Sequence, residues 1–461
     1  MLIWIAMALL PDIAFAHTGL RSATPAAGDH LSAAPGELRL TFTEPVELAF
    51  ARLAVTGPAG AVELASLTLH PDSATVLIGA IRGPLLAGSY TVNWQVAGAD
   101  GHPVRGQYSF AVAPGAAGVA AAVGPTAPGQ APPPAKHHGA LTFPTGSSFG
   151  AESPLYAGVR WLTFLGLLGV IGVVTFRVLV LSLMDRNSGP AEPGIVVVAA
   201  RHAASVGLAT LAILGVALVL RLIAQSYALH GGELALDPEL IGMMLSRTIW
   251  GWGWMLQAAA TMLGVVGLIR ARRGSRNGWG LATIGAVALA FTPGLSGHAA
   301  AVPERATLAI LADGIHVLGA GGWLGALMLV VIVGIPAALR LPHGDRGNAV
   351  ARLITAFSPI ALLFAGTVVA TGILAAWLQL GAVSALWESA YGRTLLLKLG
   401  FLSVVFGTGA YNWLRVKPAL GDAAAAARLR RSAALEVAVG VVVLAVTAIL
   451  VATATPAIGM E

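Results

Sequence analysis

Eight long apolar stretches fill the second part of this chain and constrain its fold more than any other feature. They lie at about residues 155–184, 198–224, 248–269, 278–298, 306–337, 351–380, 394–414 and 432–454. Each is long enough to cross the hydrocarbon core of a bilayer as a helix, which takes about 20 residues. With 56% hydrophobic and 10% charged residues over 461 positions, the chain is too apolar for a soluble globule. The sequence therefore predicts an all-α bundle of eight transmembrane helices.

Positive charges are distributed unequally over the connections between these stretches. The connections after the first, third, fifth and seventh stretch hold most of them: Arg186 and Arg201; Arg270, Arg272, Arg273 and Arg276; Arg340, Arg346 and Arg352; Arg415, Lys417, Arg428, Arg430 and Arg431. The opposite connections hold only Arg247, Arg305 and Arg393. Because loops rich in Lys and Arg stay in the cytoplasm, both chain termini are predicted to lie outside. This explains the net charge of +6 without a nucleic-acid partner.

The first residues of the chain have the pattern of a secretory signal. Residues 2–10 form an apolar run, and Ala14-Phe15-Ala16 is the small-x-small pattern that signal peptidase recognises, although no Lys or Arg precedes the run. We therefore expect a signal peptide at 1–16 and a mature chain that begins at His17. An uncleaved segment would leave His17 without a free α-amine.

The region that follows has the composition of a soluble domain. Short alternating runs at 37–43, 52–56, 73–78, 90–96 and 107–112 are separated by Gly, Pro and Asp, which predicts an all-β sandwich over residues 17–113. Residues 114–150 are rich in Pro, Gly and Ala, as a linker is. The membrane domain is expected at 151–461.

The predicted exported domain holds a set of metal-binding groups. A mature N-terminal His17 places an α-amine and an imidazole on one residue, and Asp100 and His102, two apart, point the same way if the backbone is extended. Three nitrogens and one oxygen suit tetragonal Cu(II), and the chain has no cysteine for thiolate ligation. In the alternative interpretation, Asp100-Gly101 is only a turn and His102 an ordinary loop residue.

The fifth apolar stretch has the densest set of ionisable groups inside the membrane. Asp313 and His316 are three apart on one helical face, and His298 ends the preceding stretch at the same external boundary. These groups could pass a metal ion inward, or Asp313 and His316 could form a buried hydrogen-bonded pair that ties helices together; spacing alone leaves both open. Gly319, Gly322 and Gly325 are expected to let neighbouring helices approach closely.

Other polar residues lie near the ends of the stretches. Asn412, Arg415 and Glu436 cluster at the predicted cytoplasmic ends of the last two, where a structural role and an exit gate are equally consistent with the sequence. Lys398 and Arg221 are near helix ends, and we expect their long side chains to extend toward the membrane surface.

The exported domain resembles the periplasmic copper-binding protein family CopC. The segments that carry the resemblance are His17-Thr-Gly-Leu-Arg-Ser-Ala-Thr-Pro-Ala-Ala-Gly, Leu40-Thr-Phe-Thr-Glu-Pro-Val and Trp94-Gln-Val-Ala-Gly-Ala-Asp-Gly-His-Pro-Val-Arg-Gly. The resemblance implies that His17, Asp100 and His102 bind Cu(II) and that Glu44 is a carboxylate beside the site. No Met occurs between Met7 and Met184, so the Met-rich Cu(I) site of some CopC proteins is not expected here.

The membrane domain resembles the CopD family of copper-resistance proteins, through Gly297-His298-Ala299, His316 to Gly325 and Tyr411-Asn412-Trp413-Leu414-Arg415. The chain as a whole is therefore similar to a fused CopC and CopD. The resemblance implies an exported Greek-key sandwich, cupredoxin- or Ig-like, joined to the eight-helix bundle. It also implies that His298 and His316 take part in handling copper.

The sequence thus predicts a copper-handling protein of a bacterial inner membrane with its N-terminal domain in the periplasm. We expect the sandwich to capture Cu(II) and the bundle to move copper across the membrane, inward. The alternatives are a copper-holding or delivery protein without transport and, third, a copper-brace oxidoreductase, which the extra Asp100 ligand disfavours. No enzymatic activity is expected. The expected partners are the bilayer, copper ions and periplasmic copper donors or cuproenzyme acceptors; no ATP-binding P-loop is present.

Overall fold

The structure is a computed structural model that describes residues 19–97, 103–115, 153–186, 193–295, 306–416 and 423–453. The described residues fall into two compact units. One contains the β-strands together with Gln225–Thr248, and the other contains the remaining helices. The predicted signal peptide at 1–16 and most of the predicted linker lie outside the described residues, and the predicted domain boundaries stay a prediction.

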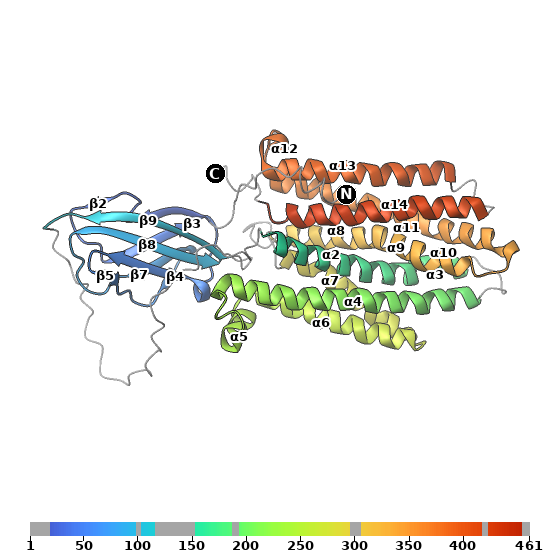
Figure 1. Cartoon of the computed structure of the whole chain (residues 1–461), viewed down its shortest axis with the longest axis horizontal. Helices are drawn as coiled ribbons and strands as arrows, with labels where there is room; N and C mark the ends of the chain where they lie inside the picture. Colours follow the sequence, from blue (N-terminus) through green and yellow to red (C-terminus); the bar gives the residue numbers. More distant parts are fainter. Residues whose placement is uncertain are drawn as a thin grey trace. The chain divides into compact units, whose positions relative to one another are not determined.

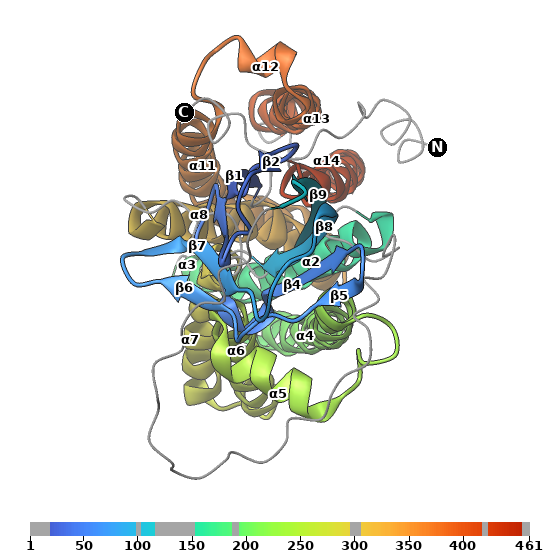
Figure 2. The ribbon, with the colours of Figure 1, turned by 90° about the vertical axis from the view of Figure 1, so that its left-hand side faces the viewer.

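The first unit is built on a β-sandwich of two sheets. One sheet has the order β1 (Leu20–Thr24), β3 (Glu37–Phe42), β7 (Ser73–Ala80), β6 (Thr68–His70). The other has the order β2 (His30–Leu31), β9 (Pro103–Val112), β8 (Gly88–Ala97), β4 (Arg52–Gly57), β5 (Gly60–Val62), as can be followed in Figure 2. Strands distant in sequence are neighbours in both sheets, which confirms the predicted Greek-key sandwich.

Alternation of apolar and polar residues builds the core of the sandwich. On β3, Leu38, Leu40 and Phe42 point inward and are at most 2% exposed, whereas Arg39 between them is exposed. The five strands expected from alternation are all present. The sequence analysis missed β1, β2, β5 and β6, which are two to five residues long and lie at or near sheet edges, where alternation has too few residues to be recognised.

The described residues also contain eight helical spans long and apolar enough to cross a membrane, which confirms the predicted bundle. They are formed, in order, by α2 (Pro154–Thr175) with η2 (Phe176–Val180) and α3 (Leu181–Arg186); α4 (Pro193–His230); α6 (Ile249–Arg272); α7 (Arg276–Leu295); α8 (Ala306–Ala320) with η4 (Gly321–Gly325), α9 (Ala326–Leu329), η5 (Val330–Gly334) and α10 (Ile335–Ala338); α11 (His343–Leu380); α13 (Ala390–Tyr411) with η6 (Asn412–Val416); and α14 (Ala423–Leu450). Two short helices, α5 (Pro238–Arg247) and α12 (Ala385–Glu388), lie between spans. In this bundle α6 packs on α7, α8 on both α7 and α11, and α13 on α14 (Figure 1).

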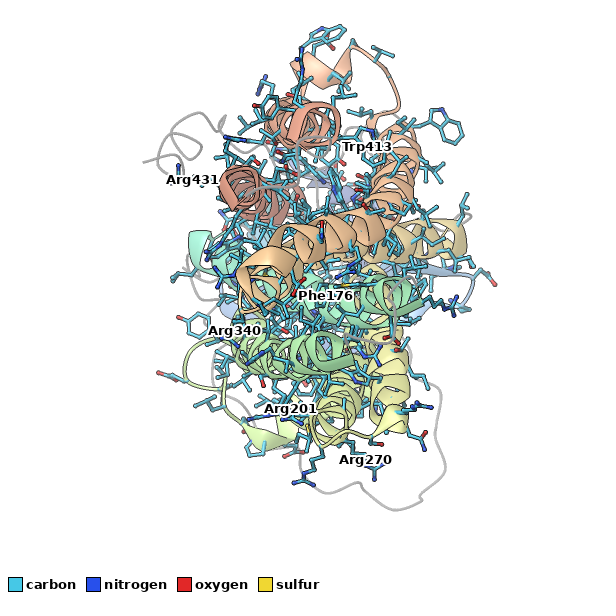
Figure 3. All side chains as sticks on the ribbon, turned by 90° about the vertical axis from the view of Figure 1, so that its right-hand side faces the viewer. Phe176, Arg201, Arg270, Arg340, Trp413 and Arg431 are labelled. Atoms are coloured by element: carbon cyan, nitrogen blue, oxygen red, sulfur yellow. The ribbon has the colours of Figure 1, made fainter. Side chains whose placement is uncertain are left out.

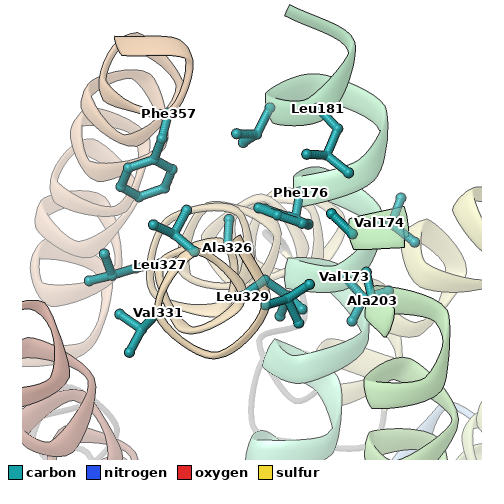
Figure 4. Packing of buried hydrophobic residues seen from close by; sticks show 14 of the residues in the cluster. Val173, Val174, Phe176, Leu181, Ala203, Ala326, Leu327, Leu329, Val331 and Phe357 are labelled. Atoms are coloured by element: carbon teal, nitrogen blue, oxygen red, sulfur yellow. The ribbon is translucent and has the colours of Figure 1, made fainter. Parts of the chain in front are cut away.

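Apolar side chains from several spans meet in the centre of the bundle. Figure 4 shows Phe176 of η2 among Val173, Leu181 and Leu329, with Phe357 of α11 on the other side of the α9 backbone. Phe176 and Leu329 are fully buried. The later part of the fifth span, from α9 to α10, belongs to this cluster, and α8 leads directly into it.

Glycines allow the fifth span to approach its neighbours, as the sequence predicted. A Cβ on Gly325 would lie 2.2 Å from the carbonyl oxygen of Leu168 on α2, and one on Gly322 would lie 2.5 Å from the ring of Phe364 on α11. A Cβ on Gly319 would lie 3.0 Å from Val368. At Gly325 the obstructing atom belongs to the backbone and cannot move aside, so this helix contact depends on glycine, whereas at Gly322 and Gly319 the nearest obstructing atoms belong to side chains.

The arginines of the predicted cytoplasmic loops gather at one end of the bundle. Figure 3 views this end and labels Arg201, Arg270, Arg340 and Arg431, which come from four different parts of the chain. We refer to it as the arginine-rich end. Their common location agrees with a bundle whose spans alternate in direction.

Candidate metal centre

The start of the described chain is fixed to the segment that contains Glu44. The Gly19 N–H donates to Thr43 Oγ1 at 2.8 Å, and the Thr43 N–H donates to the Gly19 carbonyl at 2.9 Å. Leu20 is then paired with Phe42 in the register of β1 and β3. His17 lies outside the described residues, but it is only two residues before this anchored glycine, a reach of about 7 Å.

The β8–β9 hairpin is fixed to the same segment. The Glu47 N–H donates to the Ala97 carbonyl at 2.9 Å, and Ala97 pairs with Pro103 where the hairpin ladder ends. The predicted ligands Asp100 and His102 belong to residues 98–102, outside the described part of the chain. The residues that flank the 98–102 segment nevertheless lie beside Glu47, which follows Thr43 by four positions. The described backbone therefore brings the chain neighbours of all three predicted ligands to one end of the sandwich.

Two carboxylates belong to this segment. Glu44 is half-buried just after β3 ends, where the sequence predicted a carboxylate beside the metal. Glu47 is also half-buried, and burial raises its pKa above the usual range of a glutamate. The sequence analysis missed Glu47, because only the tertiary contact with Ala97 brings it to the hairpin. A bound cation would favour the ionised form that burial disfavours.

A buried tryptophan packs within the β8–β9 hairpin. Trp94 of β8 is 6% exposed and meets the Phe42 ring edge-on, with 5.2 Å between ring centroids. It is paired across the hairpin with Gly106, where a Cβ would lie 2.3 Å from the Trp94 ring. The indole therefore occupies the space above a glycine, and this fit fixes the pairing of the strands that lead into the 98–102 segment.

In the membrane domain, Asp313 and His316 lie on α8 and contact different helices. His316 Nδ1 is 2.9 Å from Thr371 Oγ1 of α11. Asp313 instead borders α7, where a Cβ on Gly294 would lie 3.3 Å from Asp313 Oδ2. Among the described residues no hydrogen bond joins Asp313 to His316, so the two groups are not a direct pair. His298 lies outside the described residues.

Lys398 of α13 is the charged neighbour of both groups. It interacts electrostatically with the Asp313 carboxylate and with the His316 ring, although no ion pair within 4.0 Å involves Lys398 in the described part of the chain. The sequence analysis expected this lysine to extend toward the membrane surface. Lys398 is half-buried, and the direction in which it faces around α13 cannot be read from the periodicity of the sequence. Its extension to the membrane surface stays a prediction.

The described residues contain no group of three or more His, Cys, Asp or Glu side chains that could hold a metal ion. A transient site formed by Asp313 and His316 would therefore need ligands from residues outside the described part, or water. One nitrogen of the His316 ring, Nδ1, lies next to the Thr371 hydroxyl.

Comparison with known families assigns each part of the chain. Residues 20–113 match the CopC domain, residues 151–306 match the copper resistance protein D-like N-terminal domain, and residues 351–450 match copper resistance protein D. Together these matches cover the sandwich and seven of the eight spans; the fifth span and the first residues of the sixth lie between the two matches to the membrane domain.

Individual relatives agree with this assignment. The chain is 27% identical over 467 aligned residues to the copper transport protein CutJ of Bacillus subtilis, covering 98% of this chain and 78% of that protein. It is 28% identical to copper resistance protein D of Pseudomonas syringae, over 64% of this chain and 96% of that one. It is 38% identical to copper resistance protein C of Escherichia coli, over 22% of this chain and 83% of that one.

A CopC-type β-sandwich joined to eight membrane-spanning helices defines a multi-pass membrane protein of the copper-resistance class. The chain belongs to the family of fused CopC and CopD copper proteins.

Proposed function

We propose that the sandwich captures Cu(II) in the bacterial periplasm through His17, Asp100 and His102, with Glu44 as a neighbouring carboxylate. The observation that carries this proposal is the anchoring of Gly19 and Ala97 to the single segment Thr43–Glu47. An N-terminal amine, two imidazoles and a carboxylate form a donor set that suits Cu(II). Since the amine must lose its proton to bind, the affinity falls as the pH is lowered.

We further propose that the membrane domain moves copper across the inner membrane, inward, past His298, Asp313 and His316. A relative over nearly the whole chain is named a copper transport protein, which supports this choice. An entering cation would compete with the Lys398 ammonium for the Asp313 carboxylate. That competition weakens binding, and a transported ion must leave its site as well as enter it. Periplasmic copper donors and cuproenzyme acceptors are the partners that fit this role.

Copper binding is tested on the purified full chain by electron paramagnetic resonance. Wild type is expected to show one Cu(II) signal with nitrogen couplings, which His102→Ala changes or abolishes. His30→Ala is the matched control, because His30 is an exposed histidine of the same sandwich. An unchanged signal in His102→Ala would contradict the proposed ligand set.

Transport is tested by copper accumulation in spheroplasts at limiting external Cu(II). We expect uptake with wild type that collapses in His316→Ala and persists in His202→Ala, a change at an exposed histidine of α4. If cytoplasmic copper never rises while His102→Ala still abolishes Cu(II) binding, the protein is a copper-holding or delivery protein. Oxygen consumption by the ascorbate-reduced copper complex would instead indicate an oxidoreductase.

A further inference from the structure

A buried carboxyl group lies in the last span, away from the groups assigned to copper. Glu436 of α14 is 4% exposed and lies eight residues after Arg428, where the span begins, which is about 12 Å along the helix axis. It shares a helix face with the buried residues Ala433 and Val439. A carboxylate at such a position is costly unless something offsets its charge.

Among the described residues, one neutral donor contacts this carboxyl group. The Asn412 Nδ2 amide donates to Glu436 Oε1, and Ser432 Oγ donates to Asn412 Oδ1 at 2.6 Å. Asn412 is 9% exposed and is the first residue of the π-helical turn η6, a type of distortion that often occurs at functional positions. The chain of donors from Ser432 through Asn412 thus ends on one carboxyl oxygen.

The second oxygen faces the backbone of the neighbouring helix. A Cβ on Gly409 of α13 would lie 3.6 Å from Glu436 Oε2, in ordinary van der Waals contact. No hydrogen bond to Oε2 is found in the described part of the chain. Because Gly409 has no side chain, Glu436 Oε2 lies against the α13 backbone, and no described donor compensates a negative charge on it.

Within the described part of the chain, no cation pairs with Glu436 either. The charged groups on the helices that pack against it at this end are Arg415 of η6, Asp345, Arg346 and Arg352 of α11, and the exposed Arg428, Arg430 and Arg431 of α14 itself. Among the described residues none forms an ion pair within 4.0 Å with Glu436, whose carboxyl group accepts the Asn412 hydrogen bond. Asp313 differs, because Lys398 lies within its electrostatic reach.

The surroundings favour a proton over a metal ion as the missing positive charge. An amide and a hydroxyl are poor copper ligands, and within the described residues Glu436 belongs to no group of three or more His, Cys, Asp or Glu side chains that could hold a metal ion. A proton on Oε2 would remove the charge and needs no further ligand. We propose that Glu436 is a proton-binding site inside the membrane domain, loaded from the arginine-rich end. We also infer that this proton is exchanged during copper movement, and this second inference rests on the proposed function.

Infrared spectroscopy of the full protein in lipid nanodiscs tests the proton site without any transport assay. At neutral pH exposed carboxyl groups, with reference pKa values of about 4, are ionised and give no carboxylic-acid C=O band. Wild type is expected to show such a band, and Glu436→Gln to lack it. Glu388→Gln, at an exposed glutamate of α12, and Asp313→Asn are the matched controls and should retain it.

Asn412→Ala keeps the test decisive if Glu436→Gln fails to fold. Loss of the amide donor should shift the C=O band to higher frequency, and an unshifted band would overturn the assignment. The proposal is also overturned if wild type lacks the band, if Asp313→Asn removes it, or if Na⁺ or K⁺ abolishes it at constant pH, which would indicate a monovalent-cation site.

The link to copper is tested separately by the pH dependence of spheroplast uptake. Wild-type uptake should vary with cytoplasmic pH, and Glu436→Gln should remove that variation while Glu388→Gln preserves it. A pH dependence unchanged in Glu436→Gln would refute the link but leave the infrared result standing. Absence of uptake in every variant would refute the proposed transport, not the proton site.

Discussion

The contact between the first and fifth spans gives a sharp test of how the bundle is held together. Gly325→Ala would place a methyl group 2.2 Å from the Leu168 carbonyl oxygen, whereas ordinary contacts begin at 3.4 Å. The two helices would have to separate by about 1.2 Å. Because the obstructing atom belongs to the backbone, no side-chain rotation relieves the contact.

The expected cost follows from this geometry. Overpacking a close-packed interior costs about 1–3 kcal/mol, and displacement of backbone belongs at the upper end, about 3 kcal/mol. Gly366→Ala on α11 is the matched control, because no atom lies within 4 Å of its added Cβ. That control should gain up to about 1 kcal/mol from helix propensity. The two variants should therefore differ by about 3–4 kcal/mol in the free energy of unfolding.

Reversible unfolding in mixed detergent micelles measures this difference. Trp323 lies within η4 and packs on Phe406 with 4.8 Å between ring centroids, so tryptophan fluorescence has a probe beside the perturbed contact. Equal unfolding free energies for Gly325→Ala and Gly366→Ala would refute the inference that this helix contact depends on glycine.

Three further predictions concern single groups. Among the residues that the structure describes, the buried Tyr108 hydroxyl has no hydrogen-bond partner, and burial raises the pKa of Tyr108 to about 12; Tyr108→Phe should therefore stabilise the protein by about 1 kcal/mol in thermal or denaturant unfolding. Burial raises the pKa of Glu47, so ionisation of this carboxyl group lowers the free energy of unfolding as the pH rises. Glu47→Gln should therefore raise the unfolding free energy of the copper-free protein at neutral pH but not in acid. Equal gains at both pH values would contradict this reasoning. Thr371→Val removes the partner of His316 and should cost about 0.5–1.5 kcal/mol of unfolding free energy, whereas Thr371→Ser should cost little.

Several features of this protein follow from local sequence. Apolar stretches of about 20 residues predicted the eight spans, and alternation predicted the five longest strands, because each signal depends only on residues close together in the chain. The donor types of the proposed copper site, which stays a prediction, and the glycines of the fifth span were likewise visible without a structure. The short edge strands were not, since two to five residues give too little pattern.

The meeting of distant groups needed the tertiary structure. The anchoring of Gly19 and Ala97 to one segment depends on strand order, which alternation does not specify. The approach of Lys398 to Asp313, 85 positions away, and of Asn412 to Glu436 depends on which face each helix turns toward its neighbour. In helices apolar on nearly every side, no hydrophobic face indicates that direction, so only packing decides it.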